Sequence, residues 1–430
     1  MLSKDKGQVE ASGSARARGL VKSKIQNLDS TSPGGINGCR VAVSEPRNAT
    51  KEFQAYVASG AAVYRVHVSV PVPEVRVGKG NLLLPTPTTN ARSEILPFLP
   101  FRSEVQSLAL MESPDGQALL GGVDCYGRAL VGKLNASSGG CSGSYQLNPP
   151  YIDGGSGEDG WAAMAFAAPH LSMIALARHY PRSIDIYDAG LHVRTMHTPH
   201  APTAIAFMPP AGTASQDAPP SMPILITEFN QVSIWDLRAS ERAGRVQSVV
   251  VDWTGSRLLA LATTFGSQER VVAAGGSDRT VSIIDPRKWT VRIKCRGALK
   301  YTITSLHFST YTANTCFIGG LDNGVLCADL QHGRVHRHGP NNSLTPQFAF
   351  RGDSRWLGVH KARSRDLLIG FGENSSLFVL DAQQAGGQQA TVTAGSPILF
   401  GAETTGSGRA SGPTSSRTLP QSSQANSGAQ

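Results

Sequence analysis

Alternating cationic and apolar side chains form the strongest candidate for a binding site in this sequence. Arg292, Lys294 and Arg296 alternate with apolar residues, and on a β-strand that spacing puts the three cations on one face. Further cations and two aromatic residues that could stack on a ligand lie close by in the chain: Arg279, Arg287, Lys288, Trp289, Lys300 and Tyr301. This basic ridge, within residues 279–301, suits an acidic protein segment or a phosphate backbone. It equally suits an outer edge strand that its charges keep soluble.

Motifs for catalysis or cofactor binding are weak by comparison. Residues 155–160 spell Gly-Ser-Gly-Glu-Asp-Gly, but Pro149 and Pro150 precede them where a dinucleotide site needs a buried strand, so we predict a loop. The sequence contains no phosphate-binding loop, nucleophile elbow or His-Glu-x-x-His zinc motif. Histidines near residues 192–200 and 332–338 lack neighbouring cysteines or carboxylates that would complete a metal site. We therefore expect no enzyme activity, catalytic residue, cofactor, metal or small-molecule substrate.

Short apolar segments that close on an aspartate recur along the chain and predict its architecture. The closing residues are spaced 44 to 52 positions apart: Asp188, Asp236, Asp285, Asp329 and Asp381. A period of about 40–50 residues built from short strands is typical of propeller blades. An acid that recurs once per blade is expected to fix turns rather than to catalyse, since Asp bonds the backbone of its own turn. The residues predicted to hold blade turns are Asp124, Asp236, Asp278, Asp285, Asp322 and Asp381.

Six repeat units can be delimited from the strand pattern. They span residues 105–134, 161–188, 203–237, 246–286, 303–330 and 348–381. Several units contain an acidic turn between two apolar runs, as in Gly275-Gly276-Ser277-Asp278 and Gly319-Gly320-Leu321-Asp322. Glycine tolerates the backbone conformation of such tight turns. The apolar runs on both sides are expected to pack between neighbouring blades.

Two of these segments resemble the signature half of WD40 repeats. They are Gly276-Ser277-Asp278-Arg279-Thr280-Val281-Ser282-Ile283-Ile284-Asp285 and Val232-Ser233-Ile234-Trp235-Asp236-Leu237. The resemblance covers about residues 100–385 and implies a WD40-type β-propeller that acts as an interaction platform. The sequence departs from the family in having a single literal Trp-Asp pair and in lacking the Gly-His dipeptide at most expected places, so the hydrogen-bond relay tied to that histidine is in doubt.

A narrower resemblance rests on three segments. Residues 285–289, 299–309 and 350–358 are similar to a plant-type WD40 protein associated with a kinesin-14 motor. That resemblance implies a role as a cytoskeletal or motor adaptor, with a kinesin-type motor as partner.

The predicted fold class is therefore all-β, with seven blades favoured over six or eight. The seventh blade is expected from residues 52–85, and strands from both chain ends are expected to close the ring, which removes exposed sheet edges. We predict three regions. Residues 1–51 are a disordered basic tail with nine Lys/Arg against four Asp/Glu, residues 52–385 are the propeller, and residues 386–430 are a disordered Gly/Ser/Gln-rich tail.

Composition indicates the cellular location of the protein. The 430 residues carry a net charge of +9 and include six cysteines without a Cys-x-x-Cys pair. The start of the chain has no apolar signal region, and no apolar run is long enough to cross a bilayer. We expect an intracellular protein, cytoplasmic or nuclear, with reduced thiols and no membrane contact.

The sequence as a whole predicts a non-enzymatic scaffold or adaptor that binds other proteins. The alternative is an RNA-associated factor that uses the basic tail and the ridge, in which case affinity should fall steeply with added salt.

Overall fold

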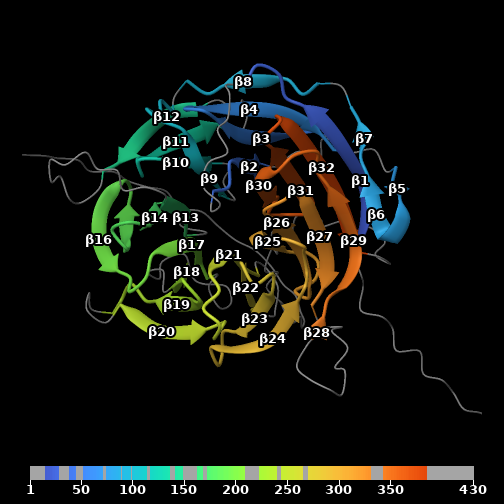
Figure 1. Ribbon diagram of the computed structural model, residues 1–430. Helices are drawn as coiled ribbons and strands as arrows, with labels where there is room; N and C mark the ends of the chain where they lie inside the picture. Colours follow the sequence, from blue (N-terminus) through green and yellow to red (C-terminus); the bar gives the residue numbers. More distant parts are fainter. Residues whose placement is uncertain are drawn as a thin grey trace, which may run out of the picture. The chain divides into compact units, whose positions relative to one another are not determined.

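The computed structural model describes residues 15–384 apart from internal gaps. The gaps are residues 29–37, 45–51, 71–73, 89, 98, 114–116, 136–140, 149–161, 168–171, 209–221, 240–243, 265–269 and 331–341. The described residues form seven sheets, each built on four antiparallel strands and arranged around a central axis, which confirms the predicted seven-bladed β-propeller (Figure 1). The segment Gly155–Gly160, His332, His336 and residues 386–430 lie outside the described residues.

Each blade has four main strands, which follow one another from the central axis to the rim. Blade A contains β2(Val41–Ser44), β3(Glu52–Ser59), β4(Ala62–Ser69) and β8(Ser93–Ile95). Blade B contains β9(Val105–Glu112), β10(Gln117–Asp124), β11(Ala129–Asn135) and β12(Cys141–Leu147). Blade C contains β13(Ala162–Phe166), β14(Met173–Arg178), β15(Ser183–Asp188) and β16(Leu191–His197). Blades D and E contain β17(Pro202–Phe207), β18(Ile224–Glu228), β19(Gln231–Trp235) and β20(Arg245–Val250); and β21(Leu258–Thr263), β22(Val272–Gly276), β23(Val281–Asp285) and β24(Thr290–Arg296). Blades F and G contain β25(Ile303–Phe308), β26(Thr315–Gly320), β27(Gly324–Asp329) and β29(Thr345–Arg351); and β30(Trp356–Lys361), β31(Leu367–Gly372), β32(Ser376–Gln384) and β1(Ala15–Lys24).

The core is divided among the seven junctions between neighbouring blades. Each junction among the described residues holds its own buried apolar cluster, such as the cluster of Phe317, Phe350, Trp356 and Phe378 between blades F and G. The middle strands are buried on both faces, which explains why they read as continuous apolar runs. Close packing also dictates glycine at Gly276, where a Cβ atom would lie 2.0 Å from the carbonyl oxygen of Arg257.

Strands from the two ends of the chain close the ring. β1 pairs with β32 in antiparallel register, with Leu20 opposite Leu380 and Ala17 opposite Ala382. Strands from both chain ends were predicted to close the ring, with a seventh blade formed from residues 52–85. In the structure, β1 from the N-terminal end completes blade G, whereas the blade that contains residues 52–85 is built from residues 41–95 alone.

The expected propeller boundary at residue 52 is wrong, because β1 and β2 precede it. Alternating small residues such as Ala15 and Ala17 are buried in blade G, while the intervening Arg16 is exposed. The strand carries four of the nine basic side chains that suggested a tail. Two of them form ion pairs: Lys22 with Asp353 of the connection between blades F and G, and Arg18 with Asp381 of blade G, the latter at 3.8 Å.

A strap links blade A to the rims of two other blades. Between β4 and β8 the chain forms β5(Arg76–Val77), the single 3₁₀ turn η1(Lys79–Asn81), β6(Leu82–Leu84) and β7(Thr86–Pro87). β6 pairs with β29 of blade F, and β7 pairs with β1 of blade G, both in parallel. A further short strand, β28(Asn342–Ser343), pairs with β24 of blade E. Figure 1 shows the strap outside β29 and β1.

Two predicted repeat units begin one strand too early. Residues 246–250 lie in β20, the outermost strand of blade D, and Phe348 lies in β29, the outermost strand of blade F. The blades that follow start at β21 and β30. The outermost strands read as openings of new units because long segments separate them from the strand they pair with.

Candidate protein-interaction surface

The basic ridge follows the outermost main strand of blade E. β24 presents exposed Arg292 and Arg296 and half-buried Lys294, whereas Cys295 points into the core. β28 runs beside only Cys295 and Arg296, so it covers one end of the strand. The structure thus brings together the three alternating cations on an edge strand.

The remaining ridge residues divide between the two faces of the ring. Arg287 and Lys288 are exposed in the β23–β24 turn, at the lower end of β24. Arg279 and Lys300 are exposed at the upper end, where Arg279 Nη1 donates to the Lys300 carbonyl oxygen at 3.5 Å. We use "upper face" for the side that carries the turns between second and third strands and the connections between blades, and "lower face" for the opposite side.

The two aromatic residues expected to stack on a ligand differ in accessibility. Trp289 has a φ of 51° in the β23–β24 turn and packs against the buried cluster between blades D and E. Tyr301 is exposed on the upper face, with Lys300 Nζ 5.4 Å from its ring centre. Trp289 therefore serves packing, and stacking on a ligand is open to Tyr301.

Exposed aromatic side chains gather on the loops of the upper face. Within the described residues they come from blades B, C and D and from the connections D–E and E–F: Tyr126, Tyr180, Phe229, Trp253 and Tyr301. Trp253 is 84% exposed and Tyr180 is 72% exposed. Sequence reasoning missed the first four residues, although each follows the second or the fourth strand of a blade. We call these five residues the aromatic face.

Contacts between loops hold this face in place. Arg257 Nη2 lies 3.3 Å from His179 Nε2, which ties the D–E connection to the blade C turn that bears Tyr180. The ring of His200 lies 5.8 Å from that of Phe229, and the His200 backbone N–H donates to Glu228 Oε2 at 3.0 Å. The aromatic face thus stands on ordered loops and adjoins Arg279 and Lys300, the upper end of the ridge.

Five of the aspartates predicted to hold blade turns accept backbone hydrogen bonds from the residue two positions later. These bonds are Tyr126 N to Asp124 at 3.0 Å, Arg238 N to Asp236 at 2.9 Å, Thr280 N to Asp278 at 3.1 Å and Arg287 N to Asp285 at 2.9 Å. Gly324 N donates to Asp322 at 3.3 Å in the same way.

Asp381 does not lie in a turn, so that prediction is wrong. It sits inside β32, opposite Gly19 of β1, and the strand continues to Gln384. Burial raises the pKa of its carboxyl group. The strand extends this far because β1 supplies backbone partners from the other end of the chain.

The central channel has a largely apolar lower end. A cavity of about 410 Å³ there is lined by the inner strands of six blades, with Met111, Met164, Phe166 and Phe207 among its walls. His307 and His360 lie 5.8 Å apart across one side, and His307 Nε2 contacts the Val359 carbonyl oxygen at 2.8 Å. Burial lowers the pKa of His307 to about 4 and that of His360 to about 3.

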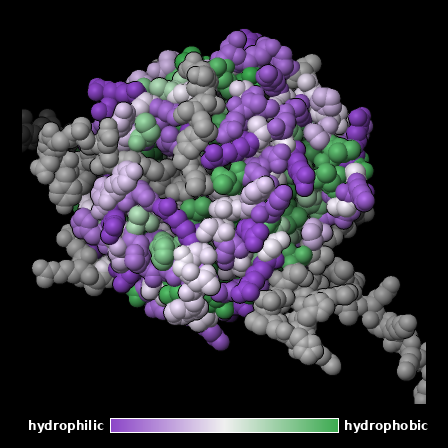
Figure 2. All heavy atoms as spheres, viewed as in Figure 1, coloured by the Kyte–Doolittle hydropathy of each residue, from purple (hydrophilic) through white to green (hydrophobic). Residues whose placement is uncertain are grey.

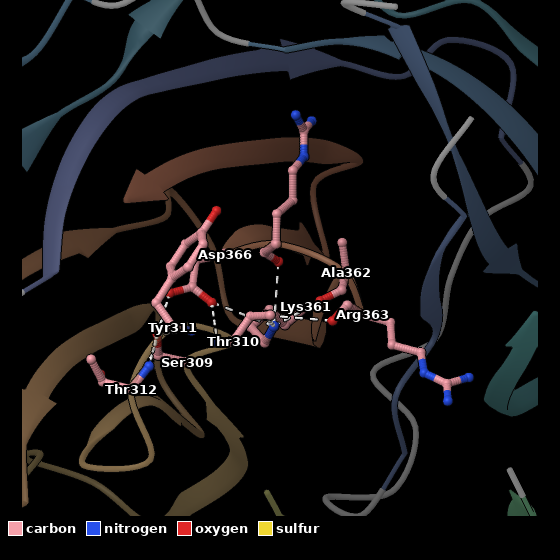
Figure 3. Close-up of polar contacts among 9 residues, drawn as sticks. Ser309, Thr310, Tyr311, Thr312, Lys361, Ala362, Arg363 and Asp366 are labelled. Carbon is pink, nitrogen blue, oxygen red and sulfur yellow. Dashed lines mark hydrogen bonds and ion pairs between the residues drawn. The ribbon is translucent and has the colours of Figure 1, made fainter. Parts of the chain in front are cut away.

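Polar groups beside this cavity hold two blades together. Figure 3 shows the Asp366 carboxylate directed at Ser309 and Thr310 of blade F: Ser309 Oγ donates to it at 2.5 Å and the Thr310 N–H at 2.7 Å. Lys361 Nζ lies 3.5 Å from Asp366 Oδ1 and also donates to Thr310 Oγ1 and to the Ala362 carbonyl oxygen. Because its donors are engaged, Lys361 links the blades and is poorly placed to act as a nucleophile or base.

Three further features concern metal binding, the cysteines and membrane insertion. No group of three or more His, Cys, Asp or Glu residues that could hold a metal ion occurs within the described ranges. The six cysteines, all of them described, are free thiols. Across the part of the chain that the structure covers, no helix has the length and apolar character to span a bilayer.

Comparison with known proteins adds no family assignment. No protein-family model matches the chain, and no curated protein matches it significantly. The structure therefore identifies the chain by its architecture, as a seven-bladed β-propeller.

Proposed function

We propose that this propeller is a non-enzymatic scaffold of the WD40 type that binds other proteins through the aromatic face and the adjoining basic ridge. The observation that carries the proposal is the display of five exposed aromatic side chains on the loops of one face. Large aromatic residues are over-represented among the residues that dominate binding energy in protein interfaces. A rigid ring that holds such loops in place is a common way to recognise partners.

The charge of the ridge indicates the partner's chemistry. Arg279 and Lys300 adjoin the aromatic face, and Arg292 and Arg296 continue the positive surface along the rim. An acidic protein segment that also offers apolar side chains would complement both features. The motor-adaptor role implied by the resemblance is one form of this proposal, with a kinesin-type motor as the partner.

The buried polar groups support a structural rather than a catalytic interior. Arg178 and Asp185 pair in blade C, and Lys361 and Asp366 pair in blade G, where Asp366 also accepts hydrogen bonds from Ser309 and Thr310 of blade F. The described residues that line the channel cavity are mainly Met, Phe, Leu and Ala.

The test is affinity capture from cell extract with the full chain as bait. The double variant Trp253→Ala/Tyr180→Ala should lose captured proteins that the unaltered chain retains. The matched control is Leu191→Ala/Val193→Ala, which removes two exposed apolar side chains from blade C, 74% and 61% exposed. Equal capture by both double variants would exclude the aromatic face as the binding surface. The presence of a kinesin-type motor among the lost proteins would support the adaptor role.

RNA binding is the second candidate, and the ridge is the observation that favours it. Binding of a single-stranded RNA 20-mer that weakens about tenfold or more between 50 and 200 mM salt would support this alternative. The variant Arg292→Ala/Arg296→Ala should then reduce the salt dependence. A truncation of residues 1–51 is unsuitable for testing the role of the basic segment, because it removes β1 and thereby opens the ring.

A further inference from the structure

A cavity at the lower end of the basic ridge is lined by three arginines. It has a volume of about 360 Å³ and is formed by Arg270, Val271, Ile283, Ile284, Asp285, Arg287 and Arg292. The strand register explains this assembly: Val272 pairs with Ile284, and Ile284 pairs with Val291. Val271, Asp285 and Arg292, which each follow or precede one of these three residues in the chain, therefore meet at the lower end of the blade E sheet.

The described residues that line this arginine cavity include three arginines and one carboxylate, that of Asp285. That carboxylate already accepts the backbone N–H of Arg287 at 2.9 Å, which fixes the turn. Arg270 Nη2 is buried and has no hydrogen-bond partner in the described structure. A buried guanidinium nitrogen without an acceptor is unfavourable, so the site favours an incoming oxyanion.

We infer that the arginine cavity receives a phosphate monoester carried by a serine or threonine of the partner protein. Guanidinium groups offer paired N–H donors that match phosphate oxygens, and such charge-assisted hydrogen bonds are among the stronger ones in proteins. Arg270, on the approach to β22, and Arg287, in the β23–β24 turn, come from separate segments and can contact one dianion. The inference rests on the proposed scaffold function, since the phosphate belongs to a bound partner.

The surroundings of the cavity favour a phosphorylated protein over a nucleic acid. Its inner wall is formed by the apolar residues Val271, Ile283 and Ile284, which suit the methylene or methyl group of a modified side chain. Recognition of single-stranded nucleic acid relies on exposed aromatic side chains that stack on bases. The nearest ridge aromatic, Trp289, is packed against the core, and Tyr301 lies on the opposite face.

The test uses the full chain and two fluorescein-labelled peptide pools. One pool has phosphoserine at the centre of seven positions, with the six flanking positions randomised, and the other has serine in its place. Fluorescence anisotropy should show binding of the phosphoserine pool about tenfold or more tighter than the serine pool. Arg287→Ala should weaken the phosphoserine binding about tenfold, and Arg270→Ala/Arg287→Ala should abolish it. Because Arg287 is exposed in a turn, its removal leaves the core intact.

Lys133→Ala is the matched control, since it removes one exposed cation from blade B, outside the basic ridge. A change of less than about twofold in this variant would place the recognition in the cavity. Equal losses in Lys133→Ala and Arg287→Ala, or equal binding of both pools, would overturn the inference. Equal competition by a single-stranded RNA 12-mer and by the phosphoserine pool would also overturn it. If phosphoserine binding fails while Trp253→Ala/Tyr180→Ala still loses captured proteins, this inference is refuted and the scaffold proposal stands. If that double variant captures as much protein as its control, the scaffold proposal itself is refuted.

Discussion

Arg178 Nε donates to Asp185 Oδ2 at 2.6 Å, and the two side chains are 3% and 1% exposed. Arg178 Nη1 also donates at 2.8 Å to the carbonyl oxygen of Gly127, in the turn of the preceding blade. Thr195 Oγ1 donates to the second carboxylate oxygen of Asp185 at 2.7 Å. This buried ion pair therefore joins blades B and C as well as two strands of blade C.

Breaking this pair from one side should be costly. Asp185→Ala leaves the Arg178 charge buried without its partner, and we expect a loss of about 3–5 kcal/mol in unfolding free energy. Chemical denaturation measures it. The exposed pair Arg238–Asp236, with its closest atoms 2.7 Å apart, is the control. There Arg238→Ala should cost far less than Asp185→Ala, and similar losses in the two variants would contradict the argument.

Asp366 should matter more than the hydroxyl that contacts it. Asp366→Asn keeps the shape but removes the charge opposite Lys361, and we expect a loss of about 3 kcal/mol. Ser309→Ala removes one hydrogen bond to the same carboxylate and should cost about 1 kcal/mol. Thermal unfolding of both variants checks the order. A larger loss in Ser309→Ala would show that the hydrogen bond, rather than the charge, stabilises the junction.

Closure of the ring should depend on the buried face of β1. Leu20 is 3% exposed and packs in the cluster between blades F and G. Leu20→Ala should lower the unfolding free energy by about 2–5 kcal/mol through the cavity it leaves. It should also promote aggregation, because detachment of β1 bares the edge of β32. Lys24→Ala, at an exposed position of the same strand, should be close to neutral. Light scattering and denaturation together measure these effects.

The two channel histidines should make the fold sensitive to mild acid. Burial is the first cause of the lowered pKa values of His307 and His360, and Lys361 contributes to both. In the unfolded chain the same imidazoles titrate near 6.5, so below that pH the unfolded state binds more protons. Their contribution to stability is therefore complete above about pH 6.5 and is lost as pH falls toward 4, by about 1–3 kcal/mol.

Variants separate this effect from general acid sensitivity. His360→Leu removes a buried Nδ1 that has no partner in the described structure. The difference in unfolding free energy between pH 7.5 and pH 5 should therefore shrink. His197→Gln, at an exposed position of β16, should leave that difference unchanged. An unaltered pH dependence in His360→Leu would refute the assignment.

The repeated hairpins could be predicted from sequence because their signals are local. The apolar runs before and after Asp278 became β22 and β23, and the side chain of Asp278 binds the turn between them. What failed was the assignment of distant partners. β1 looks like a basic tail because half of its side chains face outward, and the apolar half includes small residues such as Ala15 and Ala17. Its pairing with β32 depends on residues more than 350 positions away.

The candidate site was predictable in part for the same reason. Alternation of charge placed Arg292, Lys294 and Arg296 on one strand, and the structure agrees. Arg270 was missed because it approaches the arginine cavity from another segment, and Trp253 because a single exposed aromatic in a loop carries no periodic signal. Only the arrangement of blades brings such residues into common surfaces. On one side of the ring in Figure 2, hydrophilic residues predominate, with smaller apolar patches between them.

The pairing of β1 with β32 also sets an order of events during synthesis. β1 emerges from the ribosome long before its partner and stays unpaired until residues 376–384 have been made. Six blades can form from neighbouring segments as they appear, but the last seam closes only after β32 has emerged. Until then the apolar face of β1 is exposed to non-native contacts, which makes this strand a candidate for chaperone binding.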